Sequence, residues 1–252
     1  ALTGEQAYDR ALAALDGVRK DSPFYPAALS ERVGLRGKQG DQAGALALAA
    51  SLAGSPGATI AARQRYADLL AEQAREADAA EVYARVLAQA GDAATWTQHL
   101  QLGGALERAG KWREALPHLR KAVELAPEQP VALNYLGYAQ IERGENLDEA
   151  TALLERASKL RPEDAAITDS LGWAYFRKGE VKRALPLLEK AAEGEPGSVT
   201  INEHLGDAYW KLGRRFEARY AWRAAAVYAE GEQKTRLAAK LADGAGQRTA
   251  AN

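Results

Sequence analysis

The sequence of 252 residues contains no cysteine and no methionine. Without cysteine the chain has no disulfide, no thiolate zinc site and no cysteine nucleophile, and it fits a reducing or an oxidising compartment equally well. Aromatic residues make up only 7% of the chain, and the alternation of Val, Ile and Thr that strands require is scarce. Alanine and leucine occur throughout instead, which favours an all-α protein.

Long hydrophobic runs are also missing. The strongest candidate, AGALALAASLAGSPG at residues 43–57, ends in glycine and proline well before the 18 or so residues that would span a bilayer. The net charge is −1, with 47% hydrophobic and 27% charged residues, which is the balance of an ordinary folded chain. Because the sequence begins at Ala1 without methionine or a leader, we expect a processed or truncated N-terminus, which is compatible with the earlier removal of a signal peptide.

A Leu-Gly pair recurs four times, at intervals of 34, 35 and 34 residues. Each pair is followed at nearly fixed distances by a second glycine and two alanines, and three of the four copies end in proline. The pairs are Leu102-Gly103, Leu136-Gly137, Leu171-Gly172 and Leu205-Gly206; the later glycines are Gly110, Gly144, Gly179 and Gly213; the alanines are Ala115, Ala150, Ala184 and Ala218, then Ala122, Ala157, Ala191 and Ala225; the prolines are Pro127, Pro162 and Pro196.

Each repeated position has a physical reason. Small residues suit the places where two helices approach closely, glycine suits a turn with positive φ between them, and proline ends the second helix. The pattern resembles the tetratricopeptide repeat, a helix-turn-helix unit of 34 residues. The resemblance implies an all-α, right-handed α-solenoid of stacked helical hairpins with a C-terminal capping helix.

The register of the pattern divides the chain into segments. We expect four well-formed units at residues 96–232 and two degenerate units at 26–93, because the later signatures are intact and the earlier ones are eroded. Residues 1–25 match only the second helix of a unit, which indicates an array cut from a longer one. Residues 232–243 are typical of a capping helix, and 244–252 of a flexible tail.

Two local departures from the pattern affect second helices. Pro117 and Pro186 stand a few residues inside them, which predicts a slight kink or a late helix start. The unit at 130–164 has one extra residue in its turn, where Asn146 and Glu149 are expected to cap the second helix. A tolerated insertion is favoured over a partner contact there.

The sequence shows no arrangement of residues typical of a catalytic or metal-binding site. His99, His118 and His204 fall at different repeat positions without a partner at metal spacing, and no catalytic motif or phosphate loop is present. We therefore expect no enzyme activity, no catalytic residue, no metal and no cofactor. The run KLGRRFEARYAWR, residues 211–223, mixes cations with aromatics as nucleic-acid-binding segments do. With a net charge of −1 and aromatics placed for packing against a neighbouring helix, we expect no nucleic-acid partner.

The resemblance also implies a binding surface, since first helices line the concave wall of such a superhelix. Trp173 is the strongest candidate because its repeat position has no architectural role, and aromatic side chains often dominate interfaces. Wall packing without a partner remains the alternative. The residues placed in the groove are Asn134, Tyr138, Ile141, Asp169, Trp173, Phe176, Arg177, Glu203, Asp207, Trp210 and Lys211.

The last four units look like those of large tetratricopeptide proteins of Gram-negative bacteria, which are often exported or attached to the outer membrane. Some such lipoproteins are adaptors that bring cell-wall hydrolases to a periplasmic carboxyl-terminal processing protease. The first hypothesis is thus a noncatalytic scaffold or adaptor that binds a protein segment, with a periplasmic or outer-membrane-associated location. The alternative is the substrate-recognition arm of a larger enzyme. Self-association through the exposed N-terminal helix is a third expectation.

Overall fold

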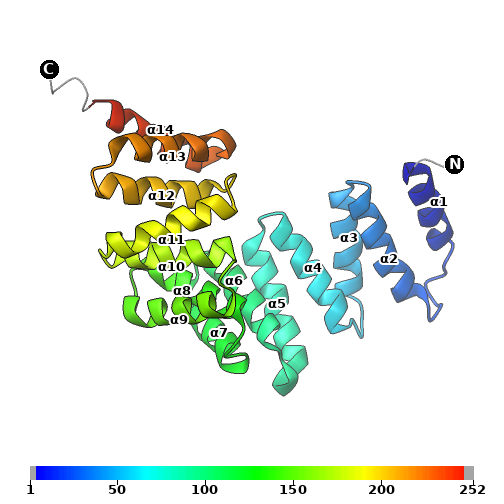
Figure 1. Ribbon diagram of the computed structural model, residues 1–252. Coiled ribbons are helices and arrows are strands. Elements are labelled where there is room, and N and C mark those ends of the chain that lie inside the picture. The colour runs from blue at the N-terminus through cyan, green and yellow to red at the C-terminus, as the bar shows by residue number, and fades with distance from the viewer. Residues whose placement is uncertain (1–3, 247–252) are drawn as a thin grey trace. The chain divides into compact units, whose positions relative to one another are not determined.

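The computed structural model describes residues 4–246 of the chain. Over these residues the structure consists of α-helices, one short 3-10 turn and connecting loops, without a strand (Figure 1). The expected all-α class of stacked helical hairpins is therefore confirmed. The helices group into two units, residues 1–125 and residues 126–252, and each unit is described by itself.

Seven helices form the N-terminal unit. They are α1 (Gly4–Asp16), α2 (Tyr25–Lys38), α3 (Gln42–Ala53), α4 (Ile60–Glu72), α5 (Glu76–Ala90), α6 (Trp96–Arg108) and α7 (Trp112–Leu125), with the 3-10 turn at Gly91–Ala93 after α5. Side-chain oxygens fix where several of them begin. Asp41 accepts from the Gly44 amide, and Thr95 forms a reciprocal capping box with Gln98.

Seven further helices form the C-terminal unit. They are α8 (Pro130–Arg143), α9 (Leu147–Leu160), α10 (Ala165–Arg177), α11 (Val181–Gly194), α12 (Val199–Lys211), α13 (Arg215–Tyr228) and α14 (Gly231–Gly246). Helix α14 starts near the beginning of the expected capping helix and includes residues 244–246, which were expected to be tail. The rest of that tail, 247–252, lies outside the described residues.

The turn between the two helices uses glycine for its backbone conformation in each of the four hairpins that carry the intact repeat pattern. Gly110, Gly144, Gly179 and Gly213 have φ of 78°, 67°, 82° and 78°, a region that side chains disfavour, and this confirms the prediction from the repeat. In the longer turn Asn146 also has positive φ, 48°, and precedes α9, but its side chain makes no capping bond. The expected capping role of the Asn146 side chain is wrong.

The glycine of each Leu-Gly pair lies where the two helices of a hairpin touch. A Cβ added to Gly103, Gly137 or Gly172 would come within 2.7, 2.8 and 2.9 Å of Leu119, Leu154 and Leu188 on the second helix. At the fourth pair, a Cβ on Gly206 would overlap the indole of Trp222. Small residues at this position are therefore a condition of hairpin packing.

In two successive hairpins, a tyrosine on the first helix forms a hydrogen bond to the hairpin before it. Tyr175 of α10 donates to Glu155 of α9 at 2.6 Å, and Tyr209 of α12 donates to Glu189 of α11 at 2.7 Å. Burial of the hydroxyl is the main cause that raises the pKa of each phenol, and the carboxylate that accepts its hydrogen bond raises it further, to about 12. The same contact in successive units ties the stack together by nearest neighbours.

Both internal prolines lie within continuous helices. Pro117 is inside α7 and Pro186 inside α11, each about one and a half turns from the start. The alternative of a late helix start is therefore wrong. Within residues 4–246, no helix has both the length and the apolar character needed to cross a membrane.

Candidate functional site

The residues that the repeat pattern assigns to a binding surface come from α8, α10 and α12, the first helices of three successive hairpins. Helix α10 packs against both α8 and α12. Four of the eleven residues are in the interior of this layer and offer almost no open surface, contrary to their assignment to the groove. They are Ile141, Asp169, Trp173 and Glu203, with exposed fractions of 0%, 4%, 9% and 5%.

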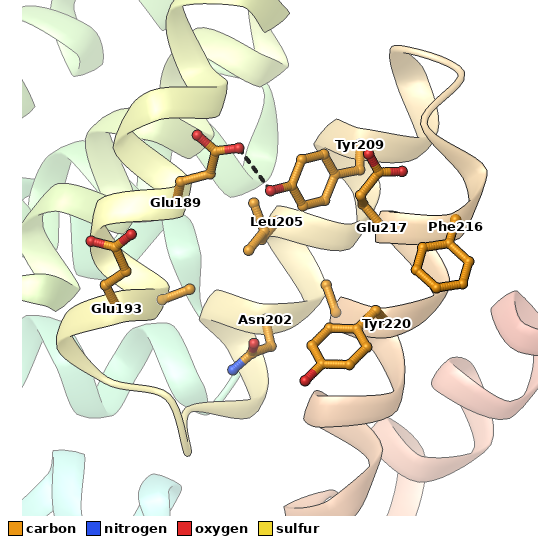
Figure 2. A pocket seen from close by; sticks show the side chains of 10 residues that line it. Glu189, Glu193, Asn202, Leu205, Tyr209, Phe216, Glu217 and Tyr220 are labelled. Carbon is orange, nitrogen blue, oxygen red and sulfur yellow. Dashed lines mark hydrogen bonds between the residues drawn. The ribbon is translucent and has the colours of Figure 1, made fainter.

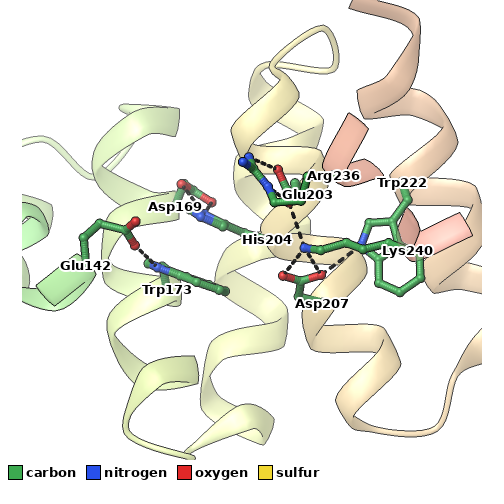
Figure 3. A network of polar contacts seen from close by, with 9 residues as sticks. All are labelled: Glu142, Asp169, Trp173, Glu203, His204, Asp207, Trp222, Arg236 and Lys240. Atoms are coloured by element: carbon green, nitrogen blue, oxygen red, sulfur yellow. Dashed lines mark hydrogen bonds and ion pairs between the residues drawn. The ribbon is translucent and has the colours of Figure 1, made fainter. Parts of the chain in front are cut away.

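Trp173 is held flat between two other rings and does not project from the wall. Its indole stacks on His204 of α12 at 3.9 Å between centroids and on Phe176 of α10 at 4.7 Å, with interplanar angles of 7° and 9°. Its Nε1 donates to Glu142 of α8 at 2.6 Å (Figure 3). Three first helices thus meet at one side chain, which explains its burial: the ring contributes shape and rigidity to the wall.

His204 is the main residue that the sequence did not identify. The sequence indicated no partner for it, yet it is buried, and its Nδ1 lies 2.9 and 3.1 Å from the carboxylate oxygens of Asp169. Since a carboxylate oxygen accepts, the Nδ1–H tautomer of His204 is the one that donates in this pair. The signal was an acidic residue and a histidine at adjoining repeat positions one unit apart, at 169 and 204.

The α12 end of the layer is closed by cations from α14. Lys240 lies 2.7 Å from carboxylate oxygens of both Glu203 and Asp207, and Arg236 forms a two-point contact with Glu203 at 2.7 and 2.8 Å (Figure 3). Burial raises the pKa of Glu203, but Arg236 and Lys240 outweigh it and lower that pKa to about 2. The carboxylates expected to meet a partner are therefore neutralised by the chain itself.

The remaining predicted residues keep some exposure. We call five of them the first-helix surface: Tyr138, Phe176, Arg177, Trp210 and Lys211. Phe176 rests on Trp173, and the Arg177 guanidinium lies 6.0 Å from that indole. Trp210 is partly covered by Arg215, whose guanidinium stacks 3.5 Å from its ring. Asn134 and Asp207 are also partly exposed, but Asp207 is paired with Lys240.

Two histidines of the N-terminal unit do meet, although the sequence indicated no partner for either. The Nδ1 atoms of His99 and His118 are 3.2 Å apart and the rings stack at 5.4 Å. Burial lowers the pKa of both imidazoles. A positive charge on His118 would lower the pKa of His99 further. In the part of the chain that the structure describes, no group of three or more histidine, cysteine or acidic side chains could hold a metal ion.

The segment 211–223 divides between interior and surface. Trp222 is buried on α13 and donates to Asp207 at 3.0 Å, as expected for a packing residue. Phe216 and Tyr220, which were expected to pack as well, are among the most exposed large side chains of the unit. That part of the expectation is wrong, because α13 turns these two rings away from its buried face.

Two family models match the chain, both described as tetratricopeptide repeat, over residues 106–174 and 170–235. Together they span just over half of the sequence. No curated protein matches it.

Solved structures share the fold over most of the chain. A tetratricopeptide repeat protein from Parabacteroides merdae is 18% identical with a TM-score of 0.76, covering 94% of this chain and 91% of that one. A thermophilic tetratricopeptide protein of Thermus thermophilus is 21% identical with a TM-score of 0.61, covering 74% and 98%. YrrB, described as having an unusual peptide-binding site, is 21% identical with a TM-score of 0.58, covering 77% and 96%. At these identities the likeness concerns the fold alone.

Proposed function

Since this chain belongs to the tetratricopeptide repeat family, whose members are generally non-catalytic scaffolds, we propose that it is a protein-interaction scaffold. It receives an apolar segment of a partner protein, with an acidic group, on the first-helix surface of the C-terminal unit. The observation that carries this proposal is the stack of Phe176 on the fixed indole of Trp173, beside Arg177. One partly exposed aromatic ring and one cation are thereby presented on a rigid support.

The buried residues below this surface make it suitable for recognition. Trp173 is fixed by rings on two sides and by the hydrogen bond to Glu142, while His204 is fixed by Asp169. Phe176 has few rotors, so it loses little conformational freedom when a partner covers it. Arg177 lies 3.7 Å from Glu142, and a carboxylate of the partner can compete with that ion pair, which is partly exposed.

A location in the bacterial envelope is the finer part of the proposal. The similarity of the last four units to envelope tetratricopeptide proteins supports an adaptor that presents substrates to a carboxyl-terminal processing protease. A periplasmic or outer-membrane-associated location follows from the same similarity. The partner in this case includes a processing protease, and the protease is the component to look for among the recovered proteins.

The test is affinity recovery from extracts of cells that express the protein. A double variant, Phe176→Ala with Arg177→Ala, removes the partly exposed ring and the cation. The matched control is Lys159→Ala with Leu160→Ala on α9, an exposed cation and an exposed large apolar residue on a second helix. We expect the first double variant to lose the partners that wild type and control recover. Equal recovery by all three proteins would remove the first-helix surface from the account.

A further inference from the structure

One face of α13 carries large apolar side chains that no part of the described chain covers. Phe216, Tyr220 and Val227 are 79%, 72% and 71% exposed. The opposite face of the same helix is buried, with Ala218, Trp222 and Ala225 packed under α14. The exposed residues therefore form a second apolar stripe on α13. The opposite, buried face already makes the contacts that pack this helix into the chain.

The spacing of this stripe is that of a helix-pairing seam. Phe216, Tyr220, Arg223 and Val227 follow one another at intervals of four, three and four residues, and all four are exposed. At 3.6 residues per turn they lie within one narrow strip along α13. Alternating steps of three and four are typical of residues that insert between those of a facing helix. We call these four residues the α13 seam.

We propose that the α13 seam is the contact between two copies of this chain, with the two α13 helices packed antiparallel about a two-fold axis. In this register Phe216 of one copy packs on Val227 of the other, and Tyr220 meets Arg223. The seam is thus complementary to itself, which a two-fold contact requires. The pairing of a guanidinium with a phenol ring adds a cation–π contact to the apolar ones.

The surroundings of the seam agree with a second copy of the chain as the occupant. A cavity of about 620 Å³ between α11, α12 and α13 adjoins Phe216 and Tyr220, and Figure 2 shows both rings at its edge. Glu189, Glu193 and Glu217 border this cavity. Arg214 of the same chain already pairs with Glu189 and Glu217, so Glu193 is the carboxylate of this edge that Arg223 of a second α13 would face.

The size of the seam sets the strength of the contact. Three large apolar side chains from each copy remove on the order of 100 Å² each from water, so the total is below the roughly 1,200 Å² of standard interfaces. The dimer is accordingly weak and reversible. Dissociation in the micromolar range or above is expected, where a concentration series can follow it.

The first experiment is sedimentation velocity on wild type from roughly 5 to 300 μM, together with one double-charge variant and one single-charge variant. Phe216→Glu with Tyr220→Glu disrupts the seam. Phe24→Glu is the control for a charge on another exposed ring, since Phe24 is 73% exposed immediately before α2. We expect wild type and Phe24→Glu to dimerise with rising concentration and the seam variant to remain monomeric. Circular dichroism confirms that all three are folded. A monomeric wild type, or dimer loss in Phe24→Glu alone, would overturn the proposal.

A second experiment tests the antiparallel register, and the absence of native cysteine makes it specific. The double variant Phe216→Cys with Val227→Cys is treated with a short bis-maleimide. We expect an inter-chain cross-link in the double variant and little in either single variant, because identical positions are about 16 Å apart over eleven residues. Cross-linking of both single variants as efficient as that of the double variant would refute the antiparallel seam.

Discussion

Replacing Gly206 by alanine separates the two effects that a helical glycine can have. A glycine inside a helix costs about 1 kcal/mol relative to alanine through its backbone freedom. Alanine would therefore be stabilising if nothing occupied the space of its Cβ. At Gly206, however, that Cβ would lie 3.0 Å from the indole Cγ of Trp222 and closer still to Cδ1 and Nε1.

The indole cannot move away without further loss. Trp222 is 3% exposed, its ring lies tilted with its centroid 5.2 Å from that of Trp210, and its Nε1 donates to Asp207. Overpacking of this kind costs typically 1–3 kcal/mol, and the overlap puts Gly206→Ala at the upper end. After the gain in helix propensity, we expect a net destabilisation of about 2 kcal/mol.

Gly34 in α2 provides the control, because a Cβ there meets nothing within 4 Å. Gly34→Ala should stabilise its helix by about 0.5–1 kcal/mol. Urea unfolding followed by tryptophan fluorescence and by circular dichroism measures both variants under the same conditions. If Gly206→Ala raises stability as much as Gly34→Ala does, the close approach of the hairpin helices is not what requires glycine.

Three further predictions concern the capping helix and the distribution of stability. The pKa of Glu203 is lowered from 4.5 to about 2. The ionised group therefore contributes about 3 kcal/mol of stability above pH 4.5, and this contribution is lost as the pH falls toward 2. Glu203→Gln should flatten the dependence of the unfolding free energy on pH over that window, and an unchanged curve would contradict the pairing. Lys240→Ala leaves Glu203 and Asp207 without a shared cation and should cost about 1–3 kcal/mol, seen as faster hydrogen exchange in α14 and not in α8. Hydrogen exchange should be faster in α1–α3, whose repeat signatures are eroded, than in α8–α12; slower exchange in α1–α3 would show that signature strength does not track local stability.

The sequence predicted the hairpin architecture because small residues act through the backbone. Glycine at a turn or at a helix contact is required by geometry that repeats in the four well-formed hairpins, so its spacing reveals the fold. Gly179 and Gly172 illustrate the two cases: the first has positive φ, and the second leaves no room for a Cβ.

Side-chain exposure could not be predicted in the same way. The repeat position indicates the direction in which a side chain leaves its helix, but the side chains of the neighbouring hairpin decide whether it is buried. Trp173 was expected to project into a groove, yet His204 from the next unit covers one face and Phe176 the other. The ion pairs of Glu203 also depended on α14, whose lysine and arginine carry no repeat signature.

A related limit applied to α13, where apolar residues occur on two faces of one helix. The buried face carries Trp222 and the repeat alanines, whereas Phe216 and Tyr220 are exposed. The number of aromatic residues in a segment does not predict which of their side chains are buried. The step of four residues from Phe216 to Tyr220 was the available signal, since it places them on one side.

Photo-cross-linking from residue 176 tests the scaffold function most directly. A benzoylphenylalanine in place of Phe176 keeps an aromatic ring on Trp173, and the same group at Leu160 on α9 serves as the exposed control. We predict a cross-linked partner protein from position 176, with its peptide mapped to an apolar segment near an acidic residue, and none from position 160. Cross-links to the same partner from position 160, with none from position 176, would contradict binding at the first-helix surface.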